Sequence, residues 1–214
     1  MNSDEAWARA HELGVSRWLR PCALAWVRSW RVEIVGRQRL DSSAPVIFAL
    51  WHGQMASLLG GVSVVGSGRV AMLAAPWAQA RFVGQVVAPL GISFVEAPTG
   101  SASLVRAARK LQQGWSMAVA VDGPAGPVGH ARSGASMLSR MTGAPVVPVT
   151  ATARPVWVPE GFWDRAAVPL PCARVEIHVG VPIAAPAGRA QVKAHVAEVQ
   201  RQLDRAPCVP GAHT

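Results

Sequence analysis

Short apolar runs alternate with segments of helical length along most of this chain, and this alternation limits the folds that it can adopt. The runs are four or five residues long and rich in Val, Ile, Leu and Ala, as expected of buried strands. They occupy residues 31–35, 46–50, 70–74, 92–95, 117–121, 146–150 and 175–179. Strands that alternate with helices predict an α/β fold with a central, mostly parallel sheet flanked by helices.

The predicted helices lie between these strands, and several of them are followed by glycine. They occupy residues 53–59, 79–90, 101–113, 135–142 and 189–203. Gly91, Gly114 and Gly143 stand where a helix end favours the left-handed backbone that glycine adopts. We expect an N-terminal amphipathic helical segment over residues 1–30, one α/β domain over 31–205 and a flexible tail over 206–214.

The chain is large enough for one sizeable core, since it has 214 residues of which 50% are hydrophobic. Its cysteines, Cys22, Cys172 and Cys208, lack metal-ligand and C-x-x-C spacing, which predicts free thiols and no metal site. No P-loop is present, and the glycines at 66–68 lack the downstream acid of a dinucleotide site. We therefore expect no bound cofactor.

The chain is strongly basic, with 21 Lys and Arg against 12 Asp and Glu. This excess favours an anionic partner, although a GC-rich coding sequence would also favour arginine. The arginines are scattered and no reader motif is present, so nucleic acid is not an expected partner. No run approaches the roughly 18 to 20 apolar residues that span a bilayer, and the first residues are too polar for a signal peptide. We expect a cytoplasmic protein.

Residues 16–31 form a two-faced pattern when wound as a helix. Arg17, Arg20, Arg28 and Arg31 gather on one side, and Trp18, Cys22, Ala25, Trp26 and Trp30 on the other. Tryptophan and arginine together suit the headgroup region of a membrane. A helix that packs on the domain through its tryptophans, with solvated arginines, explains the same pattern, and both interpretations remain open.

Two polar residues stand where predicted strands end. His52 follows the run 46–50 closely, and Asp122 follows the run 117–121 directly and opens the sequence DGPAGP. Ligands of parallel α/β sheets bind at the carboxyl edge of the strands. An imidazole beside a carboxylate is suited to general base catalysis near neutral pH. We therefore expect His52 and Asp122 to share one site.

Several motifs in order resemble the lysophospholipid acyltransferase (glycerolipid acyltransferase-like) superfamily, and in particular its bacterial DUF374 branch. They are FALWHGQ, VDGPAGP, RSGASMLSRMTGAPVVPV, WDRAAVPLP and RVEIHVGVPI, which together span residues 32–183. The resemblance implies an acyltransferase-like fold and peripheral attachment to the inner membrane. It also implies transfer of an acyl group from a coenzyme A or acyl-carrier-protein thioester to a hydroxyl or amine. The family's base falls on His52, its acid–glycine block on Asp122 and Gly123, and its apolar-proline block on Val147, Pro148 and Val149. The residues expected to bind substrate are Ser57, Gly123, Pro124, Gly126, His130, Arg132, Val147 and Pro148.

The chain also departs from the family pattern. The family motif is H-x-x-x-x-D/E, but Ser57 stands five residues after His52. The branch commonly has DGPRGP, whereas this chain has Ala125, and Glu96 opens EAPT where an arginine is common. Arginine is the expected phosphate clamp, so these changes affect a phosphate-bearing acceptor. Arg132 or a protonated His130 could replace it.

These residues predict a mechanism in which His52 removes the acceptor proton. The thioester is already activated, so no enzyme nucleophile is needed. Backbone N–H groups of the turn around Gly123, Pro124 and Gly126 are candidate oxyanion donors, while Asp122 either orients the imidazole or caps the turn. Two alternatives stay open. One is a catalytically silent relative that binds lipid or carrier protein, and the other is a biosynthetic acyl or amide transferase with a non-lipid acceptor.

Overall fold

The structure is a computed structural model that describes residues 15–40, 44–62, 69–74, 78–96, 100–123, 126–160 and 163–205. The described residues form a seven-stranded sheet with the order β1-β7-β6-β2-β5-β3-β4. Neighbouring strands are parallel except for β6 and β7, which pair antiparallel. The strands are β1 (Arg31–Val35), β2 (Ile47–Leu50), β3 (Val70–Ala74), β4 (Ile92–Glu96), β5 (Ser116–Ala120), β6 (Val146–Trp157) and β7 (Val168–Val179).

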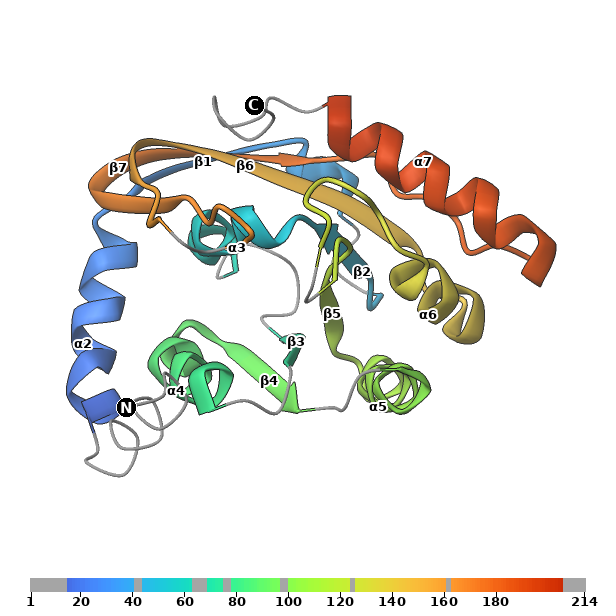
Figure 1. The fold of residues 1–214 in the computed structure, drawn as a ribbon, viewed down its shortest axis with the longest axis horizontal. Coiled ribbons are helices and arrows are strands. Elements are labelled where there is room, and N and C mark those ends of the chain that lie inside the picture. The colour runs from blue at the N-terminus through green and yellow to red at the C-terminus, as the bar shows by residue number, and fades with distance from the viewer. Residues whose placement is uncertain are drawn as a thin grey trace.

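Helices cover both faces of the sheet (Figure 1). The helices α2 (Val15–Arg28), α3 (Met55–Leu58) and α4 (Ala78–Val87) lie on one face. On the other face lie α5 (Ser101–Gln112), α6 (Gly134–Thr142) and α7 (Val192–Arg205). Short 3₁₀ turns extend several of them. The predicted α/β class with a mostly parallel, helix-flanked sheet is confirmed.

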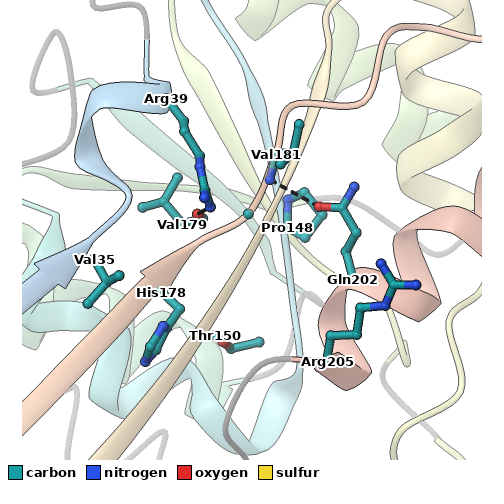
Figure 2. Close-up of a pocket in the computed structure, with 10 residues that line it drawn as sticks. Val35, Arg39, Pro148, Thr150, His178, Val179, Val181, Gln202 and Arg205 are labelled. Atoms are coloured by element: carbon teal, nitrogen blue, oxygen red, sulfur yellow. Dashed lines mark hydrogen bonds between the residues drawn. The ribbon is translucent and has the colours of Figure 1, made fainter.

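On the side of the sheet that carries α7, the edge strand β1 is left open. Its residues Arg31, Glu33 and Val35 are all exposed. Where this open region meets the end of α7, the surface is hollowed (Figure 2). The sheet is therefore covered by helices over its centre but reaches solvent at the β1 edge.

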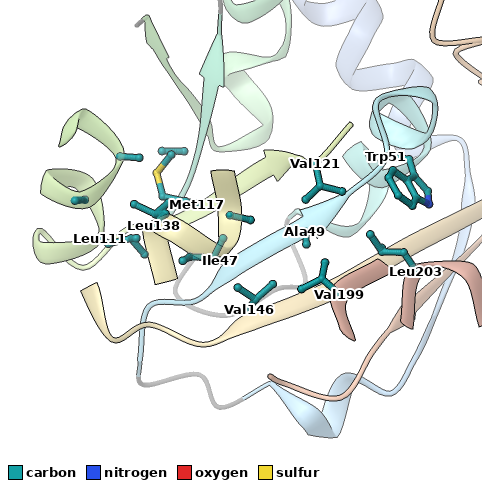
Figure 3. Close-up of a cluster of buried hydrophobic side chains, with 14 residues drawn as sticks. Ile47, Ala49, Trp51, Leu111, Met117, Val121, Leu138, Val146, Val199 and Leu203 are labelled. Atoms are coloured by element: carbon teal, nitrogen blue, oxygen red, sulfur yellow. The ribbon is translucent and has the colours of Figure 1, made fainter. Parts of the chain in front are cut away.

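The main core lies between the sheet and the helices α5, α6 and α7 (Figure 3). Ile47 and Met117 are fully buried at its centre, because β2 and β5 run through the middle of the sheet. Strands buried on both sides read as continuous apolar runs, which is why these runs were visible in the sequence. The labelled side chains are Ile47, Ala49, Trp51, Leu111, Met117, Val121, Leu138, Val146, Val199 and Leu203.

The predicted element bounds agree well for the inner strands and poorly for the β6–β7 hairpin. The run predicted over 146–150 is the first part of a strand that continues to Trp157, and β7 begins at Val168 rather than at 175. Pro155, Pro169 and Pro171 interrupt the apolar pattern there, and proline ordinarily argues against a strand because it cannot donate to the ladder. The segment predicted as a helix over 53–59 is one turn of α-helix between two 3₁₀ turns.

The helix α2 packs through its second half and exposes its start. Val27 is 8% exposed, and Trp26 Nε1 donates to the Pro169 carbonyl at 2.8 Å. Trp18 is 78% exposed. Cys22, predicted on the tryptophan side, is exposed, because α2 packs against both α4 and β7 and these neighbours select a different face. Within the described ranges no helix has the length and apolar content to cross a membrane.

A buried histidine joins α6 and α7. His195 on α7 is 7% exposed, and its Nδ1 lies 2.9 Å from Ser136 Oγ on α6. Burial lowers the pKa of His195 below its ordinary value, and the backbone of Ala184 and the charge of Glu198 oppose this only in part. The folded state therefore favours the neutral ring.

This histidine predicts a loss of stability at mildly acidic pH. Below about pH 6.5 the unfolded chain binds a proton at His195 that the folded chain does not, so the free energy of unfolding should fall as the pH falls through that value. Each unit between the two pKa values contributes about 1.4 kcal/mol. Urea unfolding at pH 7.5 and 5.5 measures it. The His195→Gln variant cannot titrate and should lose less stability over that interval, whereas equal losses in both proteins would contradict the assignment.

Candidate active site

The parallel pairing of β2 with β5 determines where the two candidate residues lie. Leu50 pairs with Ala120, and the Val121 N–H donates to the Leu50 carbonyl at 2.9 Å. Continuing this register by two residues brings His52 opposite Asp122. Both residues therefore lie at the carboxyl edge of the sheet, where parallel α/β folds bind their ligands.

The structure brings His52 and Asp122 into direct contact. His52 Nδ1 lies 2.9 Å from Asp122 Oδ1, and the backbone N–H of His52 donates to Oδ1 at 3.2 Å and to Oδ2 at 3.4 Å. The Asp122 side chain is 0% exposed and that of His52 is 23% exposed. A carboxylate that accepts from Nδ1–H selects the tautomer whose Nε2 carries the lone pair. The pair therefore has the geometry of a base and its orienting acid.

Ser57, which occupies the position of the family's carboxylate, is turned to another partner. It is fully buried, and its hydroxyl donates to the Ala167 carbonyl at 3.4 Å. The carboxylate beside the imidazole comes instead from Asp122, 70 residues along the chain. The two positions have different tasks here, since Ser57 holds a neighbouring segment and Asp122 contacts the histidine.

That neighbouring segment, residues 163–167, crosses directly over His52 and Gly53. The Ala167 N–H donates to the Gly53 carbonyl at 2.9 Å, and a Cβ atom on Gly53 would lie 2.5 Å from the Asp164 carbonyl oxygen. Glycine is required at position 53 because any side chain would push the segment away. We call residues 163–167 the strap.

Trp163 at the start of the strap forms a wall of the site. Its ring centroid lies 5.2 Å from that of His52, with the rings inclined at 60°. A Cβ atom on Gly126 would lie 3.0 Å from the same indole ring, so the ring touches both the base and the loop after Asp122. No role for Trp163 was predicted from the sequence. Its only signal was its place in the WDRAAVPLP motif.

In the described part of the loop after Asp122, few backbone N–H groups are free to stabilise an oxyanion. The Gly123 N–H donates to the Ala120 carbonyl at 3.3 Å, and prolines at 124 and 127 have no N–H. Gly126 has φ +63°, a backbone conformation that favours glycine. Pro124 lies outside the described residues. Among the described residues of this turn, Gly126 is therefore the remaining candidate whose N–H could donate to an oxyanion.

Arg132 reaches back over this loop. Its Nη2 donates to the Gly126 carbonyl, and its side chain lies against Gly123, where an added Cβ would be 3.1 Å from Arg132 Cδ. The residue is exposed, so a guanidinium stands at the rim of the site. His130 is also exposed, and its Nδ1 lies 3.1 Å from the Val128 carbonyl oxygen.

Gln200 on α7 holds the same loop from the other side. Its Oε1 accepts from the Ala131 N–H at 2.6 Å, and its Nε2 donates to the Gly129 carbonyl at 2.8 Å. A polar residue on the outer stripe of a C-terminal helix gave no hint of this contact in the sequence. The contact fixes the loop to the helix layer.

The apolar-proline block does not join the His52–Asp122 pair. Val147 is 0% exposed and packs in the core on the α3 side of the sheet, paired in register with Phe48. Pro148 points to the opposite face and lines the hollow beside α7. Both residues were predicted to bind substrate, and the structure places them in the sheet that supports the site.

Comparison with known proteins gives a relative and a structural neighbour, while no protein-family model matches the chain. An uncharacterized protein of Rickettsia prowazekii (strain Madrid E) is 29% identical over 170 residues, which cover 78% of this chain and 75% of that protein. The crystal structure of the 1-acyl-sn-glycerophosphate (LPA) acyltransferase PlsC from Thermotoga maritima is similar with a TM-score of 0.56 at 20% identity. The likeness covers 97% of this chain and 85% of that one. Membership of the DUF374 branch stays a prediction, and what the comparison establishes is that the chain has the α/β fold of this acyltransferase.

Proposed function

We propose that the protein is an acyltransferase that moves an acyl group from a coenzyme A or acyl-carrier-protein thioester to a hydroxyl or amine of a lipid-like acceptor. The observation that carries the proposal is the contact of 2.9 Å between His52 and the buried Asp122. It lies at the ligand-binding edge of a fold shared with a known acyltransferase.

In the proposed reaction His52 Nε2 takes the proton of the acceptor as its oxygen or nitrogen attacks the thioester carbon. The new bond forms, the carbonyl oxygen becomes an oxyanion, and the Gly126 N–H is the described backbone donor proposed to stabilise it. Collapse of this intermediate breaks the carbon–sulfur bond. The thiolate leaves and receives the proton from His52, so the base is regenerated and the products are the acylated acceptor and a free thiol.

Direct transfer agrees with the described residues around the pair, which include no activated nucleophile. Within the described ranges the cysteines are Cys22 on α2 and Cys172 on β7, and both are exposed away from His52. Ser57 is buried and bonded to the strap. The thioester is itself reactive enough for one-step transfer, so His52 needs only an acceptor and a donor.

The site geometry also bears on the two alternatives. The carboxylate lost from position 57 is supplied by Asp122, so the family-like base is still oriented, which favours an active enzyme over a silent lipid- or carrier-protein-binding relative. A non-lipid acceptor stays an alternative. Arg132, the arginine that could hold an acceptor phosphate, donates to the Gly126 carbonyl, so that part of its guanidinium is not available to a phosphate.

Release of free thiol tests the proposal. The donors are acyl-CoA and acylated carrier protein with acyl chains of several lengths, and the acceptors are lysophospholipid, glycerol phosphate and amines. The released thiol is measured with a chromogenic disulfide. We expect release that depends on both donor and acceptor. If the parental protein binds a donor but releases no thiol with any combination of donor and acceptor, the result would favour a catalytically silent protein that binds lipid or carrier protein.

We further propose that the start of α2 attaches the protein to a membrane surface. Trp18 and Leu19 are 78% and 39% exposed on this helix, and exposed Trp on an amphipathic helix suits the headgroup region. The double variant Trp18→Ala/Leu19→Ala should bind anionic vesicles several-fold more weakly in co-sedimentation. Met141→Ala on α6 removes an apolar side chain that is 45% exposed and should bind as the parent does. Equal binding by all three proteins would assign α2 to packing alone.

A further inference from the structure

A hollow of about 320 Å³ lies beside α7, on the open side of the sheet (Figure 2). It contains neither His52 nor Asp122 and is a separate feature of the molecule. Its lining comes from the ends of β1 and β7, from the start of β6 and from the last turn of α7. Arg39 and Arg205 stand on opposite walls.

Arg39 is held in place by the backbone around it. Its Nη1 donates to the Val179 carbonyl at 2.7 Å, which uses one of the five guanidinium N–H groups. Gly36 makes this possible: it has φ +84°, and an added Cβ atom would lie 2.6 Å from the Val179 carbonyl oxygen and 3.2 Å from Arg39 Nη1. The guanidinium is therefore positioned at the hollow before any ligand binds.

Gln202 brings the opposite wall into position. Its Oε1 accepts from the Val181 N–H at 3.0 Å, and its Nε2 donates to Glu198 Oε1 at 3.1 Å. These bonds tie the last turn of α7 to the end of β7. Arg205, three residues further on, is carried to the hollow by this contact.

The floor of the hollow holds a polar group without a partner. Thr150 and His178 are paired across β6 and β7, so their side chains lie on the same face. Thr150 is 2% exposed, and its hydroxyl has no hydrogen-bond partner in the described part of the chain. An unpaired buried hydroxyl costs free energy, and an oxygen atom in the hollow would give it a partner.

Two acids near the hollow, Glu176 and Glu198, already have partners. Glu176 Oε1 lies 2.5 Å from His178 Nε2, and Glu198 is bonded to Arg201 and Gln202. Neither Arg39 nor Arg205 forms an ion pair with any acid among the described residues. Hydrogen bonds from Gln202 and Arg201 lower the pKa of the Glu198 carboxyl, and Arg205 is close enough to add to this effect. Two guanidinium groups therefore face one cavity with no carboxylate in direct contact with either among the described residues.

We propose that this hollow is a second ligand site and that it binds a phosphate group. Guanidinium groups from two walls and a hydroxyl from the floor approach from different directions, which suits a tetrahedral oxyanion better than a flat carboxylate. The volume exceeds that of a bare phosphate, so the group can be free or part of a small phosphate monoester. The proposal concerns binding alone and does not depend on acyl transfer.

Calorimetric titration with inorganic phosphate, at constant ionic strength set with chloride, tests the site. The Arg39→Gln and Arg205→Gln variants should each weaken phosphate binding about tenfold or more, because each removes a charge-assisted contact. Thr150→Val should weaken binding while leaving the unliganded protein as stable as the parent, since it removes a hydroxyl that has no partner. Phosphate binding by the parent that is no stronger than that by Arg39→Gln and Arg205→Gln would overturn the proposal.

Three controls separate this site from others. Arg174→Gln removes an exposed charge from β7 outside the hollow, and an equal loss of affinity there would mean diffuse charge attraction rather than a site. His52→Ala and Arg132→Gln should bind phosphate like the parent, because a site at the catalytic loop would lose affinity in them instead. If glycerol phosphate binds more tightly than inorganic phosphate, the natural ligand is a phosphate ester rather than free phosphate. If acetate binds as tightly as phosphate, the assignment of a phosphate group is wrong.

Discussion

Replacing His52 with alanine is expected to lower acyl transfer by roughly 10² to 10⁴, the range attributed to a positioned general base. The imidazole is the group placed to take the acceptor proton, and its Nδ1 is already held by Asp122 at 2.9 Å. Thiol release under saturating donor and acceptor measures the change. The loss should appear mainly in kcat, because the imidazole accepts the proton in the transition state and contributes little to binding of the substrates in the ground state.

The same experiment has a matched control in this chain. His130 lies on the loop after Asp122 but is exposed and contacts the Val128 carbonyl rather than His52 or Asp122, so His130→Ala should keep a near-parental kcat. A role of His130 in holding an acceptor phosphate would raise KM instead. Circular dichroism and thermal unfolding establish that both variants fold. Parental turnover by a folded His52→Ala protein would remove His52 from the mechanism.

The inner part of this fold could be predicted because its strands are buried on both sides. β3 has the bounds expected from its apolar run, and β2 and β5 differ from theirs by at most one residue at either end. The left-handed glycines at 91, 114 and 143 closed their helices or turns as expected. In the β6–β7 hairpin tertiary pairing overrides local preference, and strands continue through prolines that ordinarily end them.

The candidate site divides in the same way. His52 and Asp122 could be placed together from sequence because both follow strands that reach one edge of a parallel sheet. Trp163 and Gln200 could not, since their contacts with the site join segments 111 and about 70 residues apart in sequence that only the folded hairpin and α7 bring together. The position of a residue at the end of a strand can be predicted from the sequence, whereas the position of a side chain on a distant segment depends on tertiary contacts.

Ser57 illustrates why a motif position and a function can separate. The side chain at the fifth position after the histidine is fully buried and bonds to the Ala167 carbonyl of the strap. A carboxylate there would face a carbonyl oxygen and would be repelled by it, so the strap as built excludes the family's usual acid from this position. Asp122 receives two donors from His52, the ring and the backbone N–H, and so stays satisfied when buried.

Replacing Asp122 with asparagine is expected to lower turnover by roughly 10² to 10⁴, as for loss of the orienting acid of a catalytic histidine. The amide oxygen can still accept from the His52 backbone N–H, so the turn should survive and the loss of stability should be far smaller than the loss of rate. The amide cannot stabilise an imidazolium, and it accepts at one oxygen only. If Asp122 only caps the turn, turnover should stay near the parental value, because asparagine is also a good turn former.

The double variant His52→Ala/Asp122→Asn decides between a working pair and two independent residues. If the carboxylate acts through the imidazole, its loss has nothing left to affect once the ring is gone, so the double variant should be no slower than His52→Ala alone. Independent roles would multiply, and the double variant would then be slower than the parent by the product of the two single effects. Multiplicative losses would leave His52 as a base without a partner and would reassign the contact of 2.9 Å to the support of the loop on which the proposed oxyanion donor lies.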